Sequence, residues 1–180
     1  ENISINQSNA STTLNATSAT VETAGGVAGI FSGELKDIQM NSVTVKAGTI
    51  AGGAVGSSAK AQLENVVLDG KVSAKTAGGM IGVLENPNNS FVKNSFISGG
   101  VSGEKLAAGV IAEVGSNSTY IAKTEQALVE STVIAAKAEG EISAAVIAKA
   151  DKGTFSDNEN AKILSNVYYS SYQNESIFGT

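Results

Sequence analysis

This 180-residue chain contains no cysteine, no histidine, no arginine and no tryptophan, and it has a single proline. Without cysteine, it has no disulfides, no thiolate nucleophile and no cysteine ligands for zinc. Without histidine, it also lacks the usual general base at physiological pH. We therefore predict that the chain is not an enzyme, with no catalytic residues, no metal site and no cofactor.

Positive charge is also scarce. Twelve lysines stand against seventeen aspartates and glutamates, which gives a formal net charge of −5. Nucleic-acid-binding proteins usually present a basic stripe that includes arginine, so we predict no nucleic-acid partner. No apolar run approaches the roughly 20 residues of a membrane-spanning helix, so we also predict no membrane insertion.

Glycine is abundant, and much of it lies in a short phrase that occurs five times. The copies are Gly26-Val27-Ala28-Gly29, Gly53-Ala54-Val55-Gly56, Gly79-Met80-Ile81-Gly82, Gly109-Val110-Ile111-Ala112 and Ala145-Val146-Ile147-Ala148. They begin 27, 26, 30 and 36 residues apart. Such a period is typical of solenoids rather than of a fold with one long-range core. We interpret the repeat glycines as close-packing positions: Gly26, Gly29, Gly53, Gly56, Gly79, Gly82 and Gly109.

A second phrase follows each glycine phrase and is centred on a small polar residue. The centres are Asp37, Asn65, Asn94, Ser131 and Asn166. The position two before the centre is always Leu or Val, and the position three after it is Met, Leu, Ile, Ile or Tyr. These two positions are an odd number of residues apart, so a straight strand would point them to opposite faces. The backbone must therefore turn at the centre, where we predict a corner ladder of stacked side chains.

Together these patterns predict an all-β fold, a right-handed parallel β-helix (β-solenoid) of about five coils with variable loops. Residues 24–180 form the solenoid, and residues 1–23 form an N-terminal cap or a long first loop with a partial coil. The segment Asn2 to Ile5 is interpreted as the tail of a preceding copy. The aromatic residues near the C-terminus are expected to cap the open end of the stack. They are Tyr168, Tyr169, Tyr172 and Phe178.

Both faces of the glycine phrase are apolar or very small, whereas a strand with one wet face should alternate apolar and polar residues. Either the outer face is shielded by a neighbouring segment, domain or partner, or the glycines leave little side chain to expose.

Among the segments that connect the phrases, Asn86 to Ser90 is predicted to be a turn, and Tyr120 to Val129 a short helical excursion. Asp151 to Asn160 has oxygen ligands for calcium, but its spacing does not fit an EF-hand, so a polar loop is favoured.

The pair of phrases resembles the GLUG repeat, which has a glycine-rich core followed by an Asn-centred strand and a Gly-x-Val-x turn. The closest matches are Ala51 to Gly56 with Leu63 to Ser73, and Thr76 to Gly82 with Asn94 to Gly103. The resemblance implies a β-helical, non-catalytic region of a bacterial surface or secreted protein. Adhesin-like chains and Gram-positive immunoglobulin A1 metalloproteases contain such regions. Their zinc chemistry does not carry over, because no His-Glu-x-x-His motif is present.

The expected function is that of a non-catalytic module in a larger secreted or cell-wall-attached bacterial protein. It would act as a rigid spacer or as a surface that binds a protein or host ligand. Its expected partners are neighbouring domains of the same chain and a host glycoprotein. The alternative is a carbohydrate-active β-helix that binds or cleaves polysaccharide. Cleavage would need paired carboxylates, but Asp37 and Asp69 are interpreted as residues that form a corner and a turn. An assembly module whose open ends stack on a partner is a third hypothesis.

Overall fold

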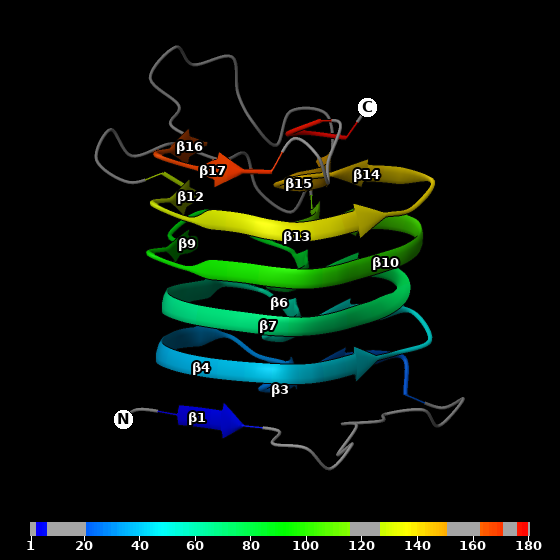
Figure 1. Cartoon of the computed structure of the whole chain (residues 1–180), viewed down its shortest axis with the longest axis horizontal. Helices are drawn as coiled ribbons and strands as arrows, with labels where there is room; N and C mark the ends of the chain where they lie inside the picture. The colour runs from blue at the N-terminus through cyan, green and yellow to red at the C-terminus, as the bar shows by residue number, and fades with distance from the viewer. Residues whose placement is uncertain (1–2, 7–20, 116–126, 151–162, 171–175, 180) are drawn as a thin grey trace.

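The computed structural model describes residues 3–6, 21–115, 127–150, 163–170 and 176–179. Every regular element in these ranges is a β-strand, and all pairings between strands are parallel (Figure 1). The prediction of an all-β parallel fold is thereby confirmed. The strands are β1 (Ile3–Asn6), β2 (Thr23–Gly25), β3 (Ala28–Ile30), β4 (Gly33–Lys46), β5 (Ile50–Gly52), β6 (Val55–Ser58), β7 (Ala61–Gly78), β8 (Ile81–Leu84), β9 (Phe91–Lys93), β10 (Phe96–Ala108), β11 (Ile111–Val114), β12 (Val129–Glu130), β13 (Val133–Glu139), β14 (Ile142–Ala144), β15 (Ile147–Ala150), β16 (Leu164–Ser165) and β17 (Tyr168–Tyr169).

The strands form two parallel sheets that are strongly curled into a half-barrel (Figure 1). The five-stranded sheet has the order β15-β11-β8-β6-β3, so its neighbours come from successive repeats. The twelve-stranded sheet contains the long strands, and β7 lies between β4 and β10 within it. Each repeat therefore hydrogen-bonds to the repeat before it and the repeat after it.

The two apolar positions that flank each polar centre are stacked in register. The column two residues before the centre pairs Leu35, Leu63, Val92, Val129 and Leu164 in succession. The column three residues after the centre pairs Met40, Leu68, Ile97, Ile134 and Tyr169. At the N-terminal end, β1 continues this order, because Ile5 pairs with Met40. Each residue of these columns therefore lies beside the equivalent residue of the next repeat.

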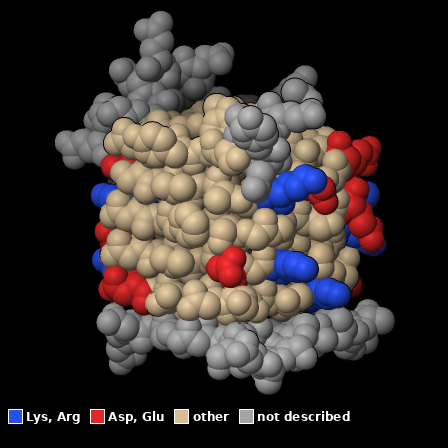
Figure 2. Space-filling view, in the orientation of Figure 1, with Lys and Arg blue, Asp and Glu red and all other residues tan. Residues whose placement is uncertain are grey.

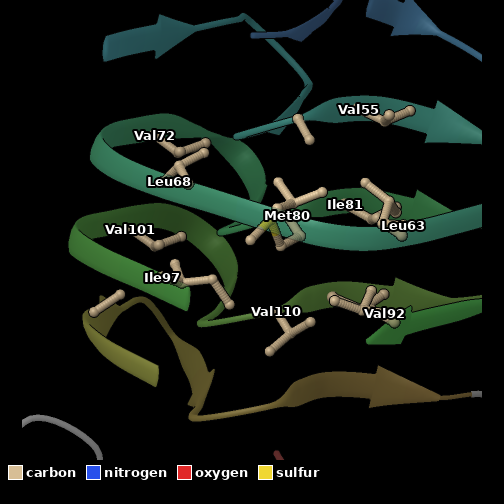
Figure 3. Close-up of a cluster of buried hydrophobic side chains, with 14 of the residues drawn as sticks. Val55, Leu63, Leu68, Val72, Met80, Ile81, Val92, Ile97, Val101 and Val110 are labelled. Carbon is tan, nitrogen blue, oxygen red and sulfur yellow. The ribbon is translucent and has the colours of Figure 1, made fainter. Parts of the chain in front are cut away.

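Inward-facing residues of these columns fill the main core, together with the glycine phrases. Figure 3 shows buried side chains of β6, β7, β8 and β10 with Met80, which is fully buried, near the middle of the group. Leu68 and Ile97 project from the long strands, and Val55 and Ile81 from the smaller sheet. Burying side chains of this size contributes about 1.5–3 kcal/mol each, so this apolar interior is the main source of stability.

The segment interpreted as a turn after the Asn-centred strand is instead part of the strand. Gly70 to Ser73 lie within β7, where Val72 is buried and Lys71 and Ser73 point the other way. Asp69 is therefore not a turn former but an exposed strand residue, and its carboxylate accepts a hydrogen bond of 2.8 Å from Ser98 Oγ. The strand continues through Gly70 because inward-facing and outward-facing residues keep alternating there, with every second residue facing the core.

From the second copy onward the residues of the glycine phrase are buried, as expected if both faces are shielded, whereas the first copy is only half-buried. Ile111 belongs to the main core, whereas its neighbour Ala112 belongs to a second, separate apolar cluster with Leu106, Ala108 and Ala144. In the earlier repeats the same position is Gly56 or Gly82. A Cβ added at Gly56 would lie 2.7 Å from Thr23 Cγ2 of the preceding repeat. The cover therefore comes from a strand of this same chain.

A further copy of the glycine phrase lies near the C-terminus and was not predicted. Phe178 pairs in parallel with Ile147, and Val146 N donates a 3.0 Å hydrogen bond to Ile177 O. Ser176 to Gly179 thus occupies the position of Ala145 to Ala148 in the next layer. Phe178, which was expected to be part of an aromatic cap, continues a repeat column and is 39% exposed.

Of the predictions for the connecting segments, the structure tests only some. Asn86 to Ser90 is a turn, as predicted, because Ser90 N donates to Pro87 O at 3.0 Å and Asn89 has a φ of 57°. Of the predicted helical excursion, residues 120–126 lie outside the described ranges, and Val129 is a strand residue in β12. The candidate calcium loop, residues 151–160, and Tyr172 also lie outside those ranges.

The stacking predicts opposite costs for two glycine substitutions. A Cβ at Gly53 would overlap the carbonyl oxygen of Gly79, whereas a Cβ at Gly100 has no atom within 4 Å. We expect Gly53→Ala to lower the free energy of unfolding by about 2–3 kcal/mol, because the layers must separate. The matched Gly100→Ala should change it by less than about 0.5 kcal/mol. Urea denaturation of both variants tests this, and equal costs would refute close packing at Gly53.

A buried hydroxyl gives a second prediction. Ser58 is fully buried, and its Oγ has no hydrogen-bond partner among the residues of the structure that are described. The hydroxyl of Ser95, which is 4% exposed, accepts from Val66 N and donates to Lys93 O. We expect Ser58→Ala to raise the free energy of unfolding by about 1 kcal/mol and Ser95→Ala to lower it by a similar amount. Thermal melts in which both variants lose stability would contradict this account of Ser58.

Candidate functional site

The five polar centres all lie where the backbone turns. Each has a positive φ: 54° at Asp37, 56° at Asn65, 49° at Asn94, 46° at Ser131 and 51° at Asn166. This left-handed conformation costs most residues about 1–2 kcal/mol, but Asn and Asp adopt it because their short polar side chains bond to nearby groups. The local sequence therefore sets the corner that turns both flanking columns into the core.

A side-chain hydrogen bond joins the first two centres: Asn65 Nδ2 donates to Asp37 Oδ1 at 2.9 Å. At other levels, the layers are joined by backbone, as where Asn94 N donates to Glu130 O at 3.1 Å. The position after the centre is a buried hydroxyl in two repeats, Ser95 and Thr132. Thr132 Oγ1 donates a hydrogen bond to Glu130 O, two residues before it, and so links the two sides of the corner at Ser131.

The repeat glycines form two stacks, and neither stack faces open solvent. A Cβ at Gly26, Gly53, Gly79 or Gly109 would overlap the backbone carbonyl of the same position one repeat later. A Cβ at Gly82 would lie 2.6 Å from Ile50 Cγ2 and 2.8 Å from Ala51 O. These glycines allow close approach of backbone to backbone.

Charges alternate along the column just before the corner, a feature that the sequence analysis missed. Lys36 pairs with Glu64, Glu64 with Lys93, and Lys93 with Glu130. Lys36 Nζ lies 3.3 Å from Glu64 and 2.8 Å from Glu34. The hydrogen bond to Glu34, followed by that to Glu64, raises the pKa of Lys36 above its ordinary value. Alignment of the repeats at this position would have revealed the alternation.

The outer face of the long strands presents an apolar stripe two residues after the corner. It consists of Val67, Phe96, Val133 and Tyr168, which are paired in register on β7, β10, β13 and β17. Phe96 is 38%, Val133 42% and Tyr168 66% exposed. Figure 2 shows that the centre of this face is almost free of charge. We call these four residues the outer stripe.

Farther along the same strands, the outer face is hollowed by a groove of about 310 Å³. It crosses β4, β7, β10 and β13, and in Figure 2 blue lysine atoms gather over that part of the face, on the right. Glu139 is the one carboxylate among its described lining residues and pairs with Lys137. The lining residues are Thr44, Lys46, Lys71, Val72, Ser73, Gly100, Val101, Ser102, Lys137 and Glu139.

Among the described residues, no group of three or more acidic, cysteine or histidine side chains is placed to hold a metal ion. Asp37 and Asp69 each accept a hydrogen bond from a neutral side chain, Asn65 and Ser98. The described part of the chain also has no helix that is long and apolar enough to cross a membrane.

The corner conformation predicts a residue-specific response at Asn94. We expect Asn94→Ala to lower the free energy of unfolding by about 1–2 kcal/mol, because alanine is strained at positive φ. Asn94→Gly should cost much less, since glycine adopts this conformation freely. At Asn65 the glycine variant should also lose the hydrogen bond to Asp37, so it should be less stable than its Asn94 counterpart. Chemical denaturation of the three variants tests this order, and equal effects of alanine and glycine at Asn94 would contradict it.

Comparisons with protein-family models, with curated proteins and with solved structures found no match to this chain. The resemblance to the GLUG repeat therefore stays a prediction that rests on the residues themselves. What the chain does must be argued from its own surface.

Proposed function

We propose that this chain is a right-handed parallel β-solenoid of about five coils, related to the GLUG repeats. In this proposal it is a non-catalytic module of a larger bacterial protein that is secreted or attached to the cell wall. It acts as a rigid spacer and displays a binding surface. The observation that supports this best is the in-register stacking of equivalent positions through the successive repeats.

Stacking of this kind favours a stiff element. Each layer adds about 4.8 Å of height and bonds only to its neighbours, so the length of the stack grows with the number of repeats. The core columns are continuous from Met40 to Ile134, both of which are buried. A module built in this way holds neighbouring domains of the same chain at a fixed separation.

The outer face of the long strands is the best candidate for the binding surface. The inward-facing side chains of these strands pack in the core, whereas the outward-facing side chains differ from repeat to repeat. The outer stripe supplies exposed aromatic and β-branched side chains beside polar ones, which is the composition of many protein-binding surfaces. A host glycoprotein is the partner that we propose for this face.

The carbohydrate-active alternative is favoured by one observation, the groove at the far end of the same face. Glycoside cleavage usually needs two carboxyl groups about 5–9.5 Å apart across the scissile bond. The groove has a single described carboxylate, Glu139, and Lys137 neutralises it. The groove thus supports polysaccharide binding better than cleavage.

Calorimetric titration of the chain against a panel of host glycoproteins tests the binding role. We expect saturable binding that the double variant Phe96→Ser, Val133→Ser weakens at least about tenfold, since aromatic and apolar anchors dominate such interfaces. Ile30→Ser is the matched control, because Ile30 is 80% exposed but lies on β3 of the other sheet. No saturable binding to any glycoprotein would leave the spacer role alone, and equal losses in both variants would exclude the outer stripe.

A further inference from the structure

We propose that the groove binds an acidic glycan, a polysaccharide with carboxylate-bearing sugar units. This inference goes beyond the proposed binding at the outer stripe, because it concerns a separate site on the same face. Its starting point is a gap in a column of otherwise long or branched side chains. Thr44, Lys71, Gly100 and Lys137 are paired in register on the outer face. Only Gly100 has no side chain.

The gap is open space between two cations. A Cβ built on Gly100 has no atom within 4 Å, so the absence of a side chain here leaves a hollow and serves no close packing. Lys71 lies one layer before Gly100 and Lys137 one layer after it. Their backbones are therefore roughly 9.6 Å apart, twice the spacing of neighbouring strands. That separation leaves room for one anionic group between the two lysines.

The charges around this hollow are not fully neutralised. The lysines at other positions in register, Lys36, Lys93 and Lys149, each have a carboxylate partner within 4 Å. In the groove, Lys137 is paired with Glu139. Lys46 and Lys71 have no ion-pair partner within the described part of the chain. The groove thus keeps two free cations on a protein of net charge −5, and a ligand carboxylate would gain charge-assisted hydrogen bonds there.

The other lining groups fit sugar hydroxyls. Thr44, Ser73 and Ser102 are outward-facing residues of three successive layers, and a hydroxyl group can both donate and accept hydrogen bonds. The volume of about 310 Å³ is at the lower end of small-ligand sites. One or two sugar rings would fill it, whereas a stable protein interface needs a contact area of about 800 Å² on each partner.

An extended acidic peptide fits this place less well. Peptides that bind to sheets usually add a strand at a free edge, where backbone groups are unpaired. Within the groove, β7 is paired on both sides by β4 and β10, and β10 by β7 and β13. No backbone edge is therefore free at these two central strands. Recognition here depends on side chains, which matches the many hydroxyls of a glycan better than the amides of a peptide.

The test is a calorimetric titration with a tetrasaccharide of galacturonic acid and with its methyl ester, which has the same rings without the charge. We expect saturable binding of the acid at an ionic strength of about 0.05 M, and at least tenfold weaker binding of the ester. Binding should also weaken strongly at about 0.5 M salt, because exposed charges are screened. Lys71→Gln should weaken binding about tenfold, and Gly100→Leu should abolish it by filling the hollow. Lys60→Gln is the control, since Lys60 is exposed but outside the groove, and it should leave binding unchanged.

Three results would overturn the proposal: equal binding of acid and ester, equal loss in Lys60→Gln and Lys71→Gln, or equally tight binding of a tetraglutamate peptide. Urea midpoints of all variants show whether the fold is retained. Glycoprotein binding that depends on the outer stripe is measured separately. If it persists while the tetrasaccharide fails to bind, the groove proposal is wrong and the proposed function stands.

Discussion

The structure depends on one constraint: each repeat lies on the next at the distance set by parallel backbone hydrogen bonds. At that spacing, every residue has its own equivalent as its nearest neighbour in the next layer. Apolar positions then merge into continuous columns, as from Leu35 to Val129. Where two backbones approach most closely, as at Gly53 and Gly79, no side chain fits. The composition of the chain, rich in glycine and small apolar residues, follows from this constraint.

The same constraint explains the alternating charges beside the corner. If equivalent positions carried the same charge, like charges would be neighbours through the whole stack. Lys36, Glu64, Lys93 and Glu130 instead alternate, and each cation lies between or beside anions. Exposed ion pairs of this kind contribute only about 0–1 kcal/mol each. They therefore add little to stability, and the alternation keeps like charges from being neighbours in this column.

Inward positions are fixed by the core, so variation is concentrated on the outer face. There the columns change character along the strands, from the charged column at the corner, through the outer stripe, to the groove. The groove arises at Gly100, the one glycine in the described part of the chain where an added Cβ would have no atom within 4 Å. A glycine that is not needed for packing, set between two lysines, is the feature on which the glycan proposal rests.

The sequence by itself determined the parallel all-β layers, the corner positions and the two flanking columns. These follow from local rules: period-two alternation, odd spacing across a turn and the tolerance of Asn and Asp for positive φ. Local rules failed at Asp69, where a Gly-containing segment resembled a turn but continued as strand. They also missed Ser176 to Gly179, in which only one glycine of the phrase remains. The cover over Gly56 and Gly82 and the groove were decided by the tertiary structure alone. Each of these features depends on which residues of different repeats become neighbours, and that is set by the register between layers, not by any one segment.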